Sequence, residues 1–264
     1  MRKIFVFFCL AIGVFSTSCV PTQDLIYLQK KNEGDTAAAV NPVASKPYRV
    51  QVNDVLSIKI KALDAALVEM FNTQPATGGV QGQSAQQLYF DGYTVNDHGN
   101  IRIPVLGEVN VLGFTVEEIR TKIEKQLLDE YFNKAANIFV NVKLAGVRFT
   151  VNGEINSPGT QTLFQDKVTV LEAVANAGDI TTVGNRKEVV IVRQYPQGTE
   201  MHSLDLTDAE VMKSPYFYVQ PNDYIYIKPL KQKTWGTGTT GLQSLGLVMT
   251  MISLVTTVLL LVNR

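Results

Sequence analysis

Alternating apolar and polar positions run through the central part of the chain and predict short strands. Residues 48–60 alternate on both sides of an Asn53-Asp54 pair, which predicts two strand segments bent at that pair. Residues 93–95 and 101–105 flank a turn-rich stretch and predict a hairpin. Single strands are predicted over the other short apolar runs, at 138–142, 148–151, 189–192 and 218–227.

Two helix starts are marked by capping boxes, in which a Thr and a Glu three residues later each bind a free backbone N–H. Thr115 and Glu118 begin a helix predicted over 115–132, with apolar residues on one face. The segment that begins at Thr169 repeats this pattern and ends before Gly178, a residue type that commonly terminates helices.

One short motif occurs twice. Residues 219–223 (VQPND) match residues 50–54 (VQVND), and such a repeat indicates that one structural unit is used twice. We therefore predict an α+β chain of two small β-grasp-like modules, each with a mixed sheet and one helix. The first occupies 48–145 with a mobile insertion at 64–90, and the second occupies 146–230.

The Asn and Asp residues of the repeated motif are predicted to be structural. Their side chains hydrogen-bond to the backbone that follows them and tolerate turn conformations. We expect them to fix the same sharp reversal in both modules, and a role as ligand contacts stays open as the alternative. The residues are Asn53, Asp54, Asn222 and Asp223.

The beginning of the chain has the pattern of a bacterial export signal. A basic start, an apolar run and small residues precede Cys19. We predict a lipoprotein signal peptide over 1–18, lipidation of Cys19 and a lipidated linker over 19–47. The alternative is an ordinary signal peptide with an incidental cysteine. Because Cys19 is the only cysteine after the signal, no internal disulfide is expected.

The end of the chain carries a second apolar run. No charged residue occurs in 234–263, and 244–262 is apolar or weakly polar throughout. A helix needs about 20 apolar residues to cross a bilayer, so we predict a C-terminal transmembrane helix within 231–264. Polar and small residues recur on one helical face and are predicted to face either a lumen or a neighbouring copy. This stripe consists of Gln243, Thr250, Ser253 and Thr257.

Composition and charge limit the chemistry that the chain can perform. The formal net charge is +0, so electrostatic capture of nucleic acid is not expected. His98 and His202 are the only histidines, and both lie in polar stretches typical of solvated surface residues. No metal-ligand, nucleophile or phosphate-loop motif occurs. We therefore expect neither catalysis, nor a metal ion, nor a cofactor.

A group of tyrosines near the last predicted strands allows two interpretations. Aromatic faces form platforms for sugar rings, but Tyr is also a strong strand former that packs well on a half-wet sheet. The second interpretation is favoured. The residues are Tyr216, Tyr218, Tyr224 and Tyr226.

The sequence motifs of the two predicted modules resemble those of a known family. The first module resembles the polysaccharide biosynthesis/export domain in the segments YRVQVNDVLSIKI, DGYTVNDHGNIRIPVLGEVNVLGFTVEEI and IFVNVKLAG. The second resembles the SLBB (soluble ligand-binding β-grasp) domain in RFTVNGEINSPGTQTL, VTVLEAVANAGDIT and SPYFYVQPNDYIYIKP. The order of the two modules, together with the predicted lipid anchor and terminal helix, is similar to that of the Wza-type outer-membrane polysaccharide export lipoproteins. Larger members of that family carry two SLBB modules.

The resemblance implies a lipid-anchored outer-membrane protein with most of its mass in the periplasm. It implies a ring homo-oligomer, octamer-like in size, that conducts pre-made capsular or exopolysaccharide to the cell surface. The implied partners are an inner-membrane polysaccharide copolymerase or tyrosine kinase and the polysaccharide itself, with no nucleic acid. Two alternatives stay open: a non-pore periplasmic glycan-binding or regulatory lipoprotein, and a glycan-acting enzyme that uses carboxylates such as Asp91, Asp97 and Glu108.

Overall fold

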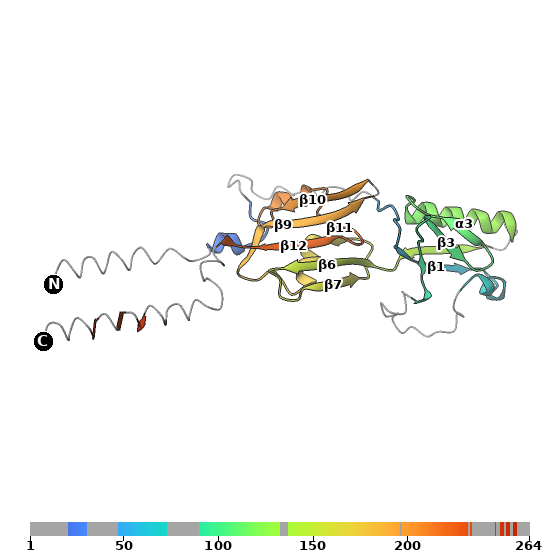
Figure 1. Cartoon of the computed structure of the whole chain (residues 1–264). Coiled ribbons are helices and arrows are strands. Elements are labelled where there is room, and N and C mark those ends of the chain that lie inside the picture. The colour runs from blue at the N-terminus through green and yellow to red at the C-terminus, as the bar shows by residue number, and fades with distance from the viewer. Residues whose placement is uncertain are drawn as a thin grey trace.

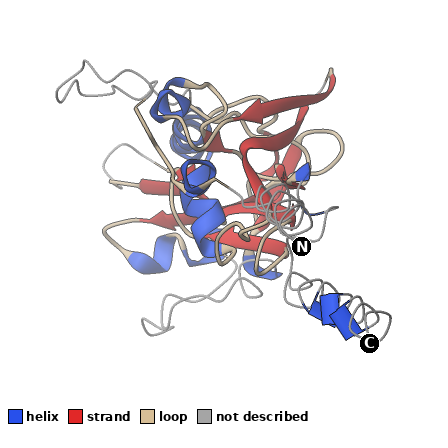
Figure 2. Ribbon diagram, turned by 90° about the vertical axis from the view of Figure 1, so that its left-hand side faces the viewer, coloured by secondary structure: helices blue, strands red, loops and turns tan. Residues whose placement is uncertain are grey.

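The protein is built from two modules that lie end to end (Figure 1). The chain passes from the first module to the second directly, between β5 (Phe139–Leu144) and β6 (Val147–Gly153). Figure 2 views the molecule from one end, with the strands and helices of both modules superposed. The computed structural model describes residues 21–30, 47–72, 90–132, 137–195, 197–231 and 233, and positions 246, 249, 250, 252, 253, 256 and 257.

The first module is a small antiparallel sheet covered by one helix. Its strand order is β2-β1-β5, and β1 (Val55–Lys61) pairs antiparallel with both β2 (Tyr93–Thr94) and β5. The helix α3 (Val116–Glu130) packs its buried residues Ile119, Ile123 and Leu127 into the core. The other elements are η2 (Ala65–Leu67), η3 (Glu69–Phe71), β3 (Asn100–Ile103) and β4 (Gly107–Asn110).

The second module contains a five-stranded mixed sheet with the order β10-β9-β12-β6-β7. The parallel pair is formed by β12 (Tyr224–Pro229) and β6, and the other neighbours in this sheet run antiparallel. A second hydrophobic core lies beneath it and includes the buried side chains of helix α4 (Val170–Asn176). The remaining elements are β7 (Gly159–Leu163), β8 (Val168–Thr169), β9 (Gly184–Tyr195), β10 (Gly198–Leu204), η5 (Ala209–Lys213) and β11 (Tyr218–Val219).

Both predicted helices are confirmed, with their capping boxes. The Thr115 side chain accepts a hydrogen bond from the Glu118 N–H, and the Glu118 carboxylate accepts one from the Thr115 N–H. Thr169 and Glu172 make the same reciprocal pair at the start of α4. These contacts satisfy donors that the first helical turn leaves free, which explains why each helix begins where it does.

The predicted strand pairing is wrong in two places. The first sheet is antiparallel rather than mixed, because α3 returns the chain so that β5 runs against β1. Residues 93–95 and 101–105 do not pair with each other as a hairpin. Instead β2 pairs with β1 and β3 pairs with β4, although Asn96 and Asn100 still form a local turn.

The start of the predicted insertion at 64–90 belongs to the core. The side chain of Phe71 is only 1% exposed and contacts the rings of Tyr131 and Phe132. Asn72 holds the end of β1 by exchanging two hydrogen bonds with the backbone of Ile60. The rest of the insertion, 73–89, lies outside the described residues.

The beginning of the predicted linker is docked on the second module. The backbone N–H groups of Leu28 and Gln29 donate to the carbonyls of Leu206 and Thr207, at 3.1 and 2.6 Å. The 3-10 turn η1 (Thr22–Leu25) lies against β9 at the outer end of that module (Figure 1). Cys19 and residues 31–46 lie outside the described residues.

The prediction of a C-terminal transmembrane helix is wrong. Within the described parts of the chain, no helix has both the length and the apolar character needed to cross a bilayer. A span requires about 20 apolar helical residues. Most of the region 231–264, with Gln243, lies outside the described residues.

Candidate functional site

The repeated Asn-Asp motif forms the same turn in both modules. Asn53 and Asn222 adopt left-handed backbone conformations, with φ of 68° and 65°, which Asn tolerates better than most residues. The aspartate that follows each one is buried, and its carboxylate accepts a hydrogen bond from the N–H of Gln51 or Gln220. Each turn leads into a central strand of its module, β1 or β12.

In the first module the buried carboxylate of Asp54 is held by Tyr48. The Tyr48 hydroxyl donates to Oδ2 of Asp54 at 2.7 Å, the same oxygen that the Gln51 N–H reaches. Burial raises the pKa of Asp54, and the two hydrogen bonds oppose that change. Burial and the charge of Asp54 also raise the pKa of Tyr48, so this phenol stays protonated.

In the second module the equivalent carboxylate forms a buried ion pair. Nε and Nη2 of Arg193 donate to the two oxygens of Asp223 at 2.9 and 2.7 Å, and Nη2 also donates to the Tyr218 carbonyl. The two side chains are 3% and 1% exposed. Burial by itself lowers the pKa of Arg193, but the hydrogen bonds and charge of Asp223 outweigh it and raise that pKa.

A stack of side chains continues from Arg193 to the surface. The guanidinium carbon lies 5.4 Å from the centre of the Tyr216 ring, whose other neighbour, His202, stacks on it at 3.5 Å between centroids. Glu200 accepts a hydrogen bond from the Tyr216 hydroxyl at 3.2 Å and lies 2.9 Å from Nε2 of His202. These contacts fix the orientation of the Tyr216 ring, because both of its faces and its hydroxyl are engaged.

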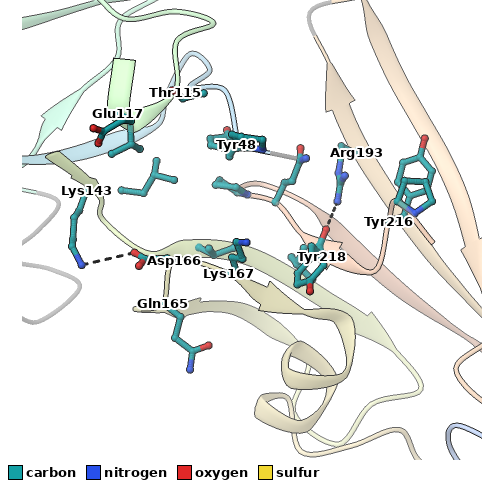
Figure 3. A pocket seen from close by; sticks show the side chains of 18 of the residues that line it. Tyr48, Thr115, Glu117, Lys143, Gln165, Asp166, Lys167, Arg193, Tyr216 and Tyr218 are labelled. Atoms are coloured by element: carbon teal, nitrogen blue, oxygen red, sulfur yellow. Dashed lines mark hydrogen bonds and ion pairs between the residues drawn. The ribbon is translucent and has the colours of Figure 1, made fainter. Parts of the chain in front are cut away.

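Tyr48, Arg193 and Tyr216 line a cleft between the two modules, which has a volume of about 640 Å³ (Figure 3). Its first wall includes the start of α3 and the end of β5, and the second includes β9 and the segment around β11. Charges of Asp223 and Arg193 contribute to the pKa of Tyr48, which places that tyrosine near both Asn-Asp turns. An exposed ion pair of 3.9 Å, Lys143 with Asp166, joins the modules across the cleft.

The connection between β7 and β8 forms the floor of this cleft. Residues 165–167 (QDK) are exposed and line it with an amide, a carboxylate and an amine. Loops that are held by rigid sheets commonly carry binding groups. Aromatic side chains together with several polar groups make the cleft suited to binding a ligand.

The other residues singled out from the sequence lie away from the cleft. Asp97 and His98 are exposed in the turn before β3, and Glu108 accepts a hydrogen bond from Asn100 across the β3–β4 ladder. The Tyr224 hydroxyl accepts a hydrogen bond from Asn152. Tyr226 is half-buried in the second module, and Asp91 is half-buried in the first.

The stripe residues that the structure describes are exposed helical positions near the end of the chain. They are Thr250, Ser253 and Thr257, and the Thr257 hydroxyl donates to the Ser253 carbonyl at 2.7 Å. Among the described residues, no group of three His, Cys, Asp or Glu side chains is placed to hold a metal ion.

Sequence reasoning missed Arg193 and Tyr48. A signal for Arg193 exists in the strand pattern, since Val189, Ile191 and Arg193 occupy the same face of β9 and all three are buried. A charged residue at an inward position requires a buried partner. No local pattern identifies that partner, because Asp223 is 30 residues away.

Comparison with known families assigns each module to a family. Residues 42–144 match the family described as "Polysaccharide biosynthesis/export protein", and residues 147–227 match the SLBB domain. The boundary between the matches falls between β5 and β6, where the two hydrophobic cores meet. The first of these families is named for export proteins and not for enzymes.

Two curated relatives carry the same name, "EPS I polysaccharide export outer membrane protein EpsA". The protein from Ralstonia nicotianae is 29% identical over 168 residues, which are 61% of this chain and 43% of the relative. The protein from Ralstonia solanacearum is 28% identical over 151 residues, 56% of this chain and 39% of the relative. The matched part therefore spans less than half the length of either relative. From the two domain matches in this order and from these relatives, the chain belongs to the polysaccharide export protein family.

Proposed function

We propose that this protein is an outer-membrane subunit for polysaccharide export, which conducts pre-made capsular or exopolysaccharide from the periplasm to the cell surface. The observation that carries the proposal is the pairing of an export domain with an SLBB domain in one chain. The relatives from Ralstonia, which are named polysaccharide export outer membrane proteins, support it.

The architecture suits passive conduction. A polymer in transit requires weak contacts at many sites, because tight binding at one site would stall it. Small sheet modules repeated around a ring supply such contacts without catalytic groups. We therefore propose that identical copies form a closed ring of octamer-like size, and that Thr250, Ser253 and Thr257 contact neighbouring copies.

We further propose that Cys19 is lipidated and anchors the chain in the outer membrane, with the two modules in the periplasm. The signal-like pattern before Cys19 supports this. The docking of residues 21–30 on the outer end of the second module would hold that module close to the lipid. The first module then extends toward the inner membrane, where a polysaccharide copolymerase or tyrosine kinase is the proposed partner.

Gene deletion followed by polymer localisation tests the export role. We expect the deletion strain to lose its surface polysaccharide while polymer accumulates inside the cell, and the wild-type gene to restore the surface polymer. A deletion strain that keeps normal amounts of surface polysaccharide would refute export. That result would favour the non-pore glycan-binding or regulatory lipoprotein instead.

A further inference from the structure

The cleft between the two modules has the size and shape of a small-ligand site. Its volume of about 640 Å³ lies within the roughly 300–1,000 Å³ typical of such sites. Both modules contribute to it, so that a ligand would contact the first wall at α3 and β5 and the second wall at β9 and β11 (Figure 3). Sites between domains are common places for ligands to bind.

The aromatic lining of the cleft is held in place before any ligand arrives. Tyr216 is stacked between His202 and Arg193, and the Tyr48 hydroxyl is bound to Asp54. Tyr218 rests edge-on against Phe217, with 5.6 Å between ring centroids. A sugar ring has apolar C–H faces and a rim of hydroxyl groups, which matches aromatic rings that end in a polar group.

The charges that line the cleft are almost fully paired. Glu117 binds Arg120 at 2.5 Å, Lys143 binds Asp166 at 3.9 Å, and Arg193 binds Asp223 at 2.7 Å. The fifth charged residue of the lining is Lys167. In the described part of the chain, neither the Lys167 amine nor the neighbouring Gln165 amide has a partner, and both are exposed.

We propose that the cleft binds a short stretch of acidic saccharide. The rings of Tyr48 and Tyr218 contact the sugar rings, whereas Tyr216 offers only its edge because both of its faces are covered. The Lys167 amine pairs with a sugar carboxylate, and the Gln165 amide binds a hydroxyl group. The chemistry follows from the single unpaired cation beside fixed aromatic rings. This inference rests on the proposed function, because it assumes that the polymer in transit is the ligand.

Calorimetric titration of the full-length protein in detergent tests the site. The probe is a set of short oligosaccharides, prepared by partial acid hydrolysis of the polysaccharide that the producing cell secretes. We expect these to bind and the Lys167→Ala variant to bind them roughly tenfold more weakly, as expected for the loss of one charge-assisted hydrogen bond. The matched control is Lys125→Ala, which removes another exposed lysine, on α3, outside the cleft.

Chemical reduction of the sugar carboxylates to alcohols provides the second arm. The reduced oligosaccharides should bind the wild type as weakly as the native ones bind Lys167→Ala, and should not distinguish the two proteins. Acetylation footprinting should show Lys167, but not Lys125, protected by the native oligosaccharides. The proposal is overturned if the native oligosaccharides do not bind, or if Lys167→Ala and Lys125→Ala bind them equally well.

The two proposals fail separately. If the deletion strain loses its surface polymer but the purified protein binds no oligosaccharide, export stands and the cleft site is refuted. If oligosaccharides bind but the deletion strain retains its surface polymer, the binding site stands and export is refuted.

Discussion

At the scale of single residues, the two buried aspartates occupy equivalent turns but have different partners. Asp54 is held by a neutral tyrosine, and Asp223 by a cation. The repeated VQxND motif singles out both aspartates in the sequence, yet it contains no information about Tyr48 or Arg193. The cleft could therefore not be predicted, because it depends on residues brought together from distant strands.

The buried ion pair should be costly to break from one side. Asp223→Ala would leave the charge of Arg193 buried without its partner, and we expect the free energy of unfolding to fall by roughly 3–5 kcal/mol. Urea unfolding measures the change. The control is Asp166→Ala, which removes one member of an exposed pair and should cost less than about 1 kcal/mol. Equal losses for the two variants would contradict the structure.

Asp54 predicts a pH dependence with a definite sign. Burial raises the pKa of Asp54 above its ordinary value of 3.8, so the folded protein binds this proton more tightly than the unfolded chain. The contribution of Asp54 to stability is therefore fully present below 3.8 and is lost as pH rises through the raised pKa. The Asn side chain of Asp54→Asn does not titrate. Lowering the pH across this window should therefore make the wild type more stable relative to Asp54→Asn.

Urea unfolding of both proteins at a series of pH values measures this difference. If the difference in the free energy of unfolding stays constant, or if Asp54→Asn becomes the more stable protein as the pH falls, the pKa of Asp54 is not raised.

At the scale of elements, local patterns predicted the helices well and the strand pairing poorly. Each helix start depends on residues only three positions apart, such as Thr115 and Glu118, so the sequence contains the whole signal. Strand partners are chosen by contacts between distant segments. The parallel pairing of β12 with β6 and the pairing of β2 with β1 have no local signature.

The capping boxes should carry measurable stability. Thr115→Ala removes the acceptor for the Glu118 N–H, and we expect a loss of about 1 kcal/mol in the free energy of unfolding. Thr121→Ala is the matched control, because Thr121 lies inside α3 and its exposed hydroxyl binds only the Glu117 carbonyl. A larger loss for Thr121→Ala than for Thr115→Ala would contradict the assigned helix start.

At the scale of the whole molecule, the segment 21–30 lies at the outer end of the second module (Figure 1). Tyr27 donates a hydrogen bond to Asp179, and Lys187 pairs with Asp24 at 2.5 Å. The segment 21–30 is therefore part of the module, where sequence reasoning expected a linker. Its composition gave no sign of this, because its contacts are mostly with residues far along the chain.

Amide hydrogen exchange tests this docking. The amides of Leu28 and Gln29 should exchange slowly, because they donate to carbonyls of the second module. Lys187→Ala should speed their exchange by removing the pair with Asp24, whereas Lys125→Ala should not. Exchange of 21–30 at the rate of an unstructured peptide in the wild type would contradict the docked arrangement.

The central claim is that copies of this chain act together as a closed ring through which polysaccharide leaves the cell. Electron microscopy of the full-length particle, extracted in detergent, tests it most directly. We predict rings of identical copies with rotational symmetry around a central opening. A population made up only of single copies or of open, unsymmetric assemblies would contradict the account.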